Sequence, residues 1–226
     1  MKFTAAVKAL VLLFVMIAII VWLKINFNTP GRYTGNNPFG PMPKCNNSKE
    51  EIDRLVQLTY KVHAVLESMG VDCWLMYGSL WGPLRGIEGP LPWDDDVDLA
   101  IKGDDNFSQM NFEEFEAKFT NAGLLIENRL RLHSRVTISE KGVWPFLDLF
   151  VFYDYKGMMK RPGIEPWIEP IHFQLYHSFP SRLIERPLPK VKFGFFSISV
   201  PRNGIEIMRH LYPKSWWKVE KPVNCK

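Results

Sequence analysis

The sequence predicts a single domain of the α/β or α+β class, because segments with the apolar spacing of a helix alternate with short apolar runs typical of strands. The clearest helix is expected at 48–70, and apolar strands are expected at 71–77, 96–101 and 143–153. The chain has 226 residues, of which 46% are hydrophobic, which is enough for one sizeable core and too few for two.

The helix expected at 48–70 has a marked beginning and end. Ser48 and Glu51 have the spacing of a capping box, in which each side chain binds a backbone N–H at the other's position. Gly70 is a typical helix stop. Apolar residues lie between them at helical spacing, namely Ile52, Leu55, Val56, Val62, Val65 and Leu66.

The later elements follow the same two patterns. After the strand at 71–77 we expect a Gly-Ser turn and a short helix that ends near Arg85. Prolines interrupt every pattern between 156 and 189, so an irregular region that covers a binding site is expected there. The remaining expectations are a helix at 111–121, alternating apolar residues at 124–138, a strand or hairpin at 191–200 and a short helix at 203–211.

Residues 1–24 are predicted to be a cytoplasmic tail and a transmembrane signal anchor. Residues 9–23 carry no charged or strongly polar side chain. The length of this apolar segment is at the short end of what crosses a bilayer. A cleaved signal peptide is the alternative, but Val21-Trp22-Leu23-Lys24 lacks the small residues of a cleavage site. Residues 25–47, rich in Asn, Pro and Gly, are expected to form a stem, and 48–226 the folded domain.

Several weaker signals favour a domain on the luminal side of the endoplasmic reticulum or Golgi membrane, in a single-pass type II topology. Asn46 and Asn106 each begin a triplet of the N-glycosylation pattern. Cys45 and Cys225 flank the domain and are candidates for a disulfide that joins its ends, whereas Cys73 lies in an apolar strand and is expected in the core. The net charge of +4, without a dense basic patch, does not suggest a nucleic-acid partner.

The residues with the most chemical information lie between the first two strands. Gly78 and Ser79 form a turn whose backbone N–H groups can approach a phosphate, because glycine has no Cβ. Asp94, Asp96 and Asp98 alternate and would share one side of a strand. Clustered carboxylates suit Mg²⁺ or Mn²⁺. A solvated acidic turn is the alternative, but the apolar flanks favour a metal site.

Residues 77–85, Tyr-Gly-Ser-Leu-Trp-Gly-Pro-Leu-Arg, and 92–99, Pro-Trp-Asp-Asp-Asp-Val-Asp-Leu, resemble the signature of the LicD/fukutin family. The resemblance extends over about residues 50–218 and includes the segments 146–150 and 211–217. It implies a nucleotidyltransferase-like mixed sheet with flanking helices. It also implies transfer of a phosphate-linked alcohol, of the phosphocholine or ribitol phosphate type, from a CDP-activated donor to a glycan hydroxyl.

The predicted metal ligands are Asp96, Asp98 and Asp148. Asp148 is the single charged residue in an otherwise apolar strand, and a buried charge requires a counter-ion or a metal. The alternative for Asp148 is a salt bridge, with Arg129, Arg131 or Arg135 as its partner.

Other residues near this motif have expected roles in donor binding and proton transfer. Asp94 is expected to be a further ligand or the base that deprotonates the acceptor hydroxyl. Gly78 and Ser79 are expected to hold the donor phosphates. Arg85 is expected either to bind the diphosphate or to pair with the acidic run. Stacking on the base of the donor is considered for Trp81 and Trp93, but packing in the core is favoured for both. Proton transfer is considered for His133, His172 and His177, but a core or surface position is favoured for each.

The sequence therefore predicts a membrane-anchored luminal phosphotransferase that depends on Mg²⁺ or Mn²⁺, with its catalytic domain at 48–226. Its expected partners are a CDP-activated alcohol donor and a glycan or glycoprotein acceptor. Two alternatives stay open, a metal-dependent glycosyltransferase that uses a nucleotide sugar and a non-catalytic luminal partner of a glycan-modifying enzyme.

Overall fold

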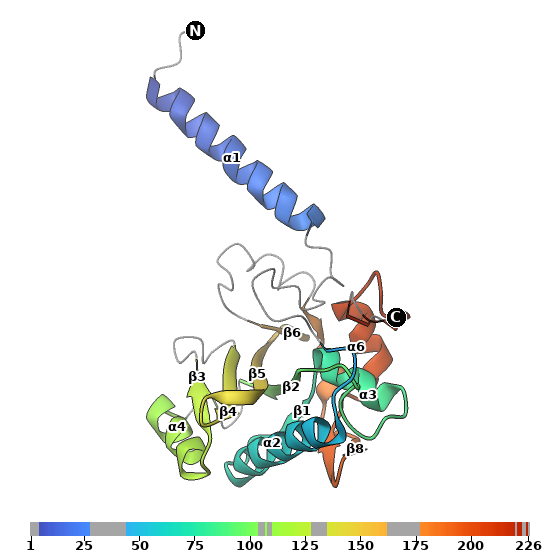
Figure 1. Ribbon diagram of the computed structural model, residues 1–226. Helices are drawn as coiled ribbons and strands as arrows, with labels where there is room; N and C mark the ends of the chain where they lie inside the picture. Colours follow the sequence, from blue (N-terminus) through green and yellow to red (C-terminus); the bar gives the residue numbers. More distant parts are fainter. Residues whose placement is uncertain are drawn as a thin grey trace.

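The computed structural model of the chain describes residues 5–27, 44–103, 107, 110–127, 135–161, 177–219, 221–222 and 225. Helix α1 (Ala5–Phe27) precedes the folded domain in Figure 1. Among these residues, no helix combines the length and apolar character that crossing a membrane requires. The predicted membrane span at the N-terminus is therefore not confirmed.

The centre of the domain is a mixed sheet, as the sequence predicted. Strand β2 (Asp96–Lys102) runs parallel to β5 (Val143–Tyr155), and both are flanked by antiparallel neighbours. The sheet order is β1-β2-β5-β4-β3, and β6 and β7 extend it beyond the end of β5. The other bounds are β1 (Cys73–Leu75), β3 (Leu125–Glu127), β4 (Arg135–Glu140), β6 (Met158–Lys160) and β7 (Phe179–Pro180).

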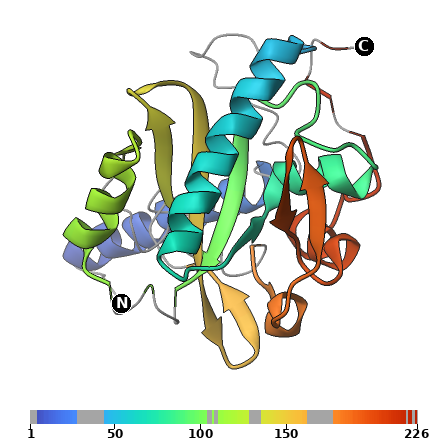
Figure 2. The ribbon, with the colours of Figure 1, turned by 90° about the horizontal axis from the view of Figure 1, so that it is seen from below.

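Helix α2 (Lys49–Ser68) lies across the sheet against β2, β4 and β5, with α4 (Phe112–Asn121) beside it (Figure 2). The capping box predicted at Ser48 and Glu51 is present. The core is formed by alternate, fully buried strand residues together with the apolar side of α2. The strand residues include Val97, Leu99, Ile101, Leu147, Leu149 and Val151. Because side chains alternate along a strand, the residues between these point to the opposite face of the sheet.

The C-terminal part of the chain packs at the β1 edge. The hairpin β8 (Lys190–Phe193) and β9 (Phe196–Ser199) is followed by α6 (Gly204–Leu211), as expected. Helix α6 lies next to the turn η1 (Tyr77–Leu80), which leads into α3 (Trp81–Leu84) (Figure 1).

The region at 156–189, expected to be irregular, contains more regular structure than predicted. Lys156 and Gly157 both have positive φ, at 53° and 84°. This is the backbone of a tight hairpin turn, which joins β5 to β6. Strand β7 and the turn η4 (Ser181–Ile184) follow, whereas residues 162–176 lie outside the described part of the chain.

The cysteines behave as the sequence indicated. Cys45 and Cys225 form a disulfide across 180 residues of sequence, which joins the two ends of the domain. Cys73 is buried in β1, and burial raises the pKa of its thiol to about 12. This value makes Cys73 an inert part of the core.

Candidate metal centre

Three carboxylates converge on the face of the sheet opposite the buried apolar set. Asp98 on β2 lies directly across from Asp148 on β5. Asp96 is two residues before Asp98 on β2 and lies on the same face of the sheet. One oxygen of each carboxylate lies within 4.8 Å of those of the other two. The structure thus brings together the three residues that the sequence predicted as metal ligands.

Asp98 is held by the turn that precedes it in sequence. Its backbone N–H donates to Ser79 Oγ at 2.8 Å, and the backbone N–H of Gly78 binds its carboxylate. Met76 N–H donates to the carbonyl oxygen of Asp98 at 3.0 Å, and Tyr77 takes a positive φ of 46° to make the turn. Gly78 and Ser79, predicted as phosphate ligands, therefore position Asp98 in this structure.

Asp148 has two side-chain partners on β4. Thr137 Oγ1 donates to Asp148 Oδ1 at 2.6 Å, and Arg135 Nη1 donates to Asp148 Oδ2 at 3.2 Å. The salt bridge considered as the alternative for Asp148 is present, and it coexists with the carboxylate cluster. Arg129 and Arg131, the other predicted partners, lie outside the described residues.

The electrostatics of the cluster favour a bound cation. Burial, together with the neighbouring carboxylates, raises the pKa of Asp96 to about 8 and that of Asp98 well above its usual value. Like charges at this separation repel, and hard oxygen ligands match Mg²⁺ and Mn²⁺. The donor set therefore fits a divalent ion.

Asp94 lies in the loop before β2 and is not one of the three converging residues. Leu91 N–H donates to its carboxylate at 2.7 Å. Burial raises the pKa of Asp94 to about 7. Hydrogen bonds from residues distant in sequence hold this loop. The backbone N–H of Asn47 donates to the Pro92 carbonyl and its side-chain amide donates to the Asp94 carbonyl. Trp144 Nε1 donates to the Asp95 carbonyl at 2.8 Å.

Arg85 contacts Trp81 and the C-terminal segment, and its expected binding of the donor diphosphate stays a prediction. Its guanidinium lies over the ring of Trp81, 4.5 Å from the centroid, and donates to the Lys218 carbonyl at 2.9 Å. Burial lowers the pKa of Arg85, and the nearby charge of Asp94 opposes that effect. Arg85 thus joins the C-terminal segment to α3, and its positive charge interacts favourably with the carboxylate of Asp94.

The aromatic and histidine candidates have mostly packing positions. Trp81 packs against Tyr212 at 6.3 Å between ring centroids, and Lys221 lies 5.6 Å from the Trp93 centroid. His177 is buried beside Tyr77, at 5.3 Å between centroids. His133 and His172 lie outside the described residues.

The sequence did not identify two residues that contribute to the site. Thr137 was only one polar position in an alternating segment, and its role depends on the β4–β5 register. Tyr212 is half-buried near the cluster, and desolvation, with the charge of Asp98, raises its pKa well above the usual value. In the sequence, Tyr212 was indicated only by its position in the segment 211–217, which resembles the C-terminal part of the family.

A mixed sheet with flanking helices that presents three converging carboxylates beside a Gly-Ser turn has the architecture of a nucleotidyltransferase-type domain. The family model described as LicD/FKTN/FKRP, nucleotidyltransferase domain, matches residues 70–203, which is more than half of the chain. The chain belongs to the LicD/FKTN/FKRP family.

Two relatives share 33% identity with this chain over 145 residues: ribitol 5-phosphate transferase FKRP of Mus musculus and that of Homo sapiens. The match covers 63% of this chain and 28% of each relative, so the chain corresponds to little more than a quarter of their length.

Among solved structures, the chain is similar to the antibiotic-resistance factor ANT(2'')-Ia. The solution structure has a TM-score of 0.41 and 13% identity, over 70% of this chain and 69% of that one. The crystal structure with adenylyl-2''-tobramycin has a TM-score of 0.39 and 16% identity, over 68% and 71%. These similarities are too distant to carry an argument about function.

Proposed function

We propose that this domain transfers a phosphate-linked alcohol from a CDP-activated donor to a glycan hydroxyl. The observation that carries the proposal is the convergence of Asp96, Asp98 and Asp148 within 4.8 Å beside the Gly78–Ser79 turn. Membership of the LicD/FKTN/FKRP family supports it, since two relatives are named as ribitol 5-phosphate transferases.

The metal is assigned by the chemistry of its ligands. Asp96, Asp98 and Asp148 would hold Mg²⁺ or Mn²⁺, which neutralises negative charge on the donor diphosphate when it is bound. Thr137 and the Gly78–Ser79 turn fix two of these carboxylates before any ligand arrives. This preorganisation lowers the cost of assembling the site during the reaction.

The reaction is a displacement at phosphorus. The acceptor hydroxyl oxygen forms a bond to the phosphorus that carries the alcohol, and the bond from that phosphorus to the bridging oxygen breaks. CMP leaves with the electron pair of that bond. Asp94, whose pKa of about 7 is near neutral, takes the hydroxyl proton and later releases it to water.

Donor turnover tests this function. The purified chain is incubated with Mn²⁺, a glycan acceptor and, separately, CDP-ribitol, CDP-choline and UDP-sugars, and nucleotide release is measured. We expect release of CMP from a CDP-alcohol only. Turnover of a UDP-sugar alone would identify a glycosyltransferase instead, and inertness to every donor would indicate a non-catalytic partner.

We also propose that the domain lies in the lumen of the endoplasmic reticulum or Golgi, held at the membrane by residues 1–24. The Cys45–Cys225 disulfide supports an oxidising compartment. Well-exposed apolar side chains of α1, such as Leu10 and Phe14, support contact with a membrane. Protease protection in sealed microsomes tests the topology, and digestion of the domain without detergent would refute it.

A further inference from the structure

Tyr212 directly follows α6, and hydrogen bonds hold its backbone on both sides. Its N–H donates to the Met208 carbonyl at 2.8 Å, which closes the last turn of the helix. Its own carbonyl accepts from the N–H groups of Ser215 at 3.0 Å and Trp216 at 2.9 Å. Because side-chain rotamers depend on the backbone, this fixed backbone limits the orientations of the Tyr212 ring.

The ring of Tyr212 packs beside the turn that holds Asp98. Its centroid lies 6.3 Å from that of Trp81, the first residue of α3, and α6 itself contacts the preceding turn η1. Within η1, Ser79 Oγ accepts from the backbone N–H of Asp98 at 2.8 Å. The same short turn therefore neighbours Tyr212 on one side and the carboxylate cluster on the other.

The phenol of Tyr212 lies close to the carboxylates but is not hydrogen-bonded to them. Asp98, Asp96 and Asp94 are all near enough to oppose its ionisation. The side chain is half-buried, and within the part of the chain that the structure describes its hydroxyl has no hydrogen-bond partner. The hydroxyl is therefore available to a ligand that binds at the cluster.

The chemistry of this hydroxyl is that of a neutral donor. Burial, together with the nearby carboxylates, raises the pKa of Tyr212 well above its usual value, so the phenol keeps its proton at physiological pH. A protonated phenol does not take a proton from the acceptor hydroxyl, and it does not compete for the metal as a phenolate. It can donate one hydrogen bond.

The phosphate oxygens of the donor match this hydroxyl. Three ionised carboxylates with one divalent ion still carry a net negative charge, so a diphosphate at the cluster requires hydrogen-bond donors. The guanidinium groups of Arg135 and Arg85 already donate to Asp148 and to the Lys218 carbonyl. A phenol donates to a phosphate oxygen without a positive charge that the carboxylates would bind instead.

We propose that the hydroxyl of Tyr212 donates a hydrogen bond to the diphosphate of the donor when the donor binds at the carboxylate cluster. This inference rests on the proposed function and adds a residue that contacts the donor phosphates. Tyr212 binds the donor, and its proton stays on the phenol oxygen throughout the reaction.

The test measures two affinities by isothermal titration calorimetry on the purified full chain. The first is the affinity for Mn²⁺ alone, and the second is the affinity for CDP at saturating Mn²⁺. Tyr212→Phe removes one hydroxyl and keeps the ring that packs on Trp81. We expect CDP affinity to fall by about 10- to 100-fold, the loss of a hydrogen bond to a charged group. Mn²⁺ affinity and the melting temperature should stay equal to those of the wild type.

Tyr60→Phe is the matched control. It makes the same chemical change on α2, which packs against the other face of the sheet, and its exposed ring contacts Phe195 at 5.1 Å between centroids. This variant should bind Mn²⁺ and CDP as the wild type does.

Each outcome decides the inference. Unchanged CDP affinity in Tyr212→Phe would overturn it, because packing on Trp81 would then be the only role of Tyr212. A loss of CDP affinity that a loss of Mn²⁺ affinity fully explains, or a failure of Tyr212→Phe to fold, would also overturn it, since the hydroxyl would then serve the metal site or the fold. Wild-type protein that binds Mn²⁺ but not CDP would overturn the proposed function as well. Normal CDP binding by Tyr212→Phe, with CMP release from a CDP-alcohol by the wild type, would overturn this inference alone.

Discussion

At the scale of single residues, the site concentrates negative charge that the fold alone does not neutralise. Asp96 and Asp98 are separated by one residue on β2, and Asp148 lies opposite Asp98. Burial and mutual repulsion oppose ionisation of this set, so it destabilises the metal-free protein. A cluster that costs stability without a ligand is typical of a functional site.

Asp98→Asn separates a metal-binding role from a structural one. The change keeps the volume but removes a charged ligand, so we expect the transfer rate to fall by at least about 100-fold. The melting temperature in EDTA should stay equal or rise, because repulsion is reduced. The control is Asp154→Asn near the end of β5, where an exposed carboxylate accepts a hydrogen bond from Gly157 N–H in the turn that follows. Full activity of Asp98→Asn at saturating Mn²⁺ and donor would contradict the assignment.

The raised pKa values predict how pH affects the metal-free protein. The folded-state pKa of Asp96 is about 8, against 3.8 as its ordinary value. The folded state therefore holds more protons between these values, and stability falls as pH rises from about 4 to 8. In EDTA, the protein should melt at a higher temperature at pH 6 than at pH 8. Asp96→Asn should reduce that difference, and an unchanged difference would count against the raised pKa.

The same protons compete with the metal. Because Asp96 must lose a proton to bind a divalent ion, Mn²⁺ affinity should increase as pH rises toward 8. Calorimetry in two buffers of different ionisation enthalpy measures the protons released on binding. Binding without proton release near pH 7 would show that the carboxylates are already ionised.

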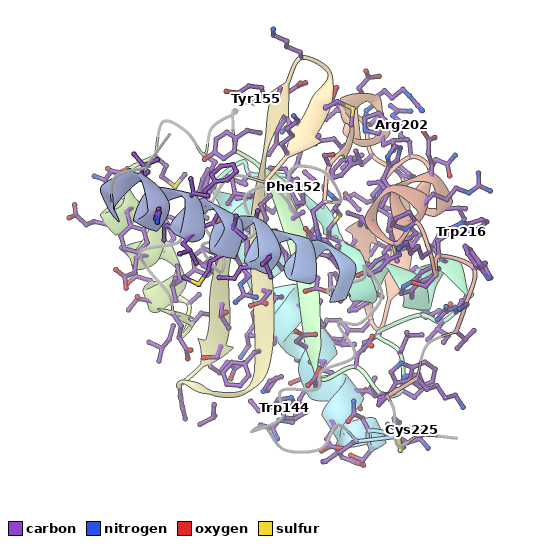
Figure 3. The ribbon with its side chains drawn as sticks, turned by 90° about the horizontal axis from the view of Figure 1, so that it is seen from above. Trp144, Phe152, Tyr155, Arg202, Trp216 and Cys225 are labelled. Atoms are coloured by element: carbon purple, nitrogen blue, oxygen red, sulfur yellow. A yellow bond between two sulfur atoms is a disulfide. The ribbon has the colours of Figure 1, made fainter. Side chains whose placement is uncertain are left out.

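At the scale of structural elements, the acidic loop depends on neighbours that are distant in sequence. Asn47 precedes α2, and Trp144 lies at the start of β5, yet both donate to carbonyls of residues 94–95. Arg54 on α2 makes a cation–π contact with Trp144, with its guanidinium 5.0 Å from the ring centroid. Figure 3 shows Trp144 at the same end of the sheet as Cys225. This loop is therefore positioned by the ends of two other elements.

Asn47→Ala tests that positioning. Removal of the side-chain hydrogen bond should cost about 1 kcal/mol of stability and should weaken Mn²⁺ binding by about 10-fold, since the metal ligand Asp96 directly follows the loop that this bond holds. Asn203→Ala removes a comparable hydrogen bond at the start of α6 and should lower stability without affecting Mn²⁺ affinity. Equal Mn²⁺ affinities in the two variants would reduce Asn47 to a purely structural role.

At the scale of the whole molecule, the disulfide joins the segment that holds the acidic loop to the C-terminus. Cys45 lies two residues before Asn47, and Cys225 follows Lys218, whose carbonyl binds Arg85. The bond closes a loop of 180 residues, which restricts the unfolded chain strongly. Both ends of the domain are thus fastened beside the site.

Replacement of both cysteines by serine should lower the free energy of unfolding by about 5 kcal/mol, the chain-entropy value for so long a loop. For a domain of this size the melting temperature should fall by roughly 10 °C. Differential scanning calorimetry of the double variant measures this, and Cys73→Ser serves as a comparison that leaves the disulfide intact. A melting temperature equal to that of the wild type would show that the disulfide adds nothing.

The sequence by itself determined the local elements and the motif. The capping box at Ser48 and the apolar spacing that follows specify α2, because helix formation depends on neighbours three and four residues apart. The alternation of Asp96 and Asp98 likewise indicated a shared face, since that follows from the two-residue period of a strand.

Only the tertiary structure decided how distant segments meet at the site. Thr137 and Arg135 contact Asp148 because β4 pairs with β5 in one register, and Asp148 faces Asp98 because β5 runs parallel to β2. A shift of one residue in either register would turn these side chains to the opposite face. The tight turn at Lys141 and Gly142, both with positive φ, fixes the register of β4 on β5. The register of β2 on β5 joins segments about 50 residues apart, so it depends on packing of the whole sheet.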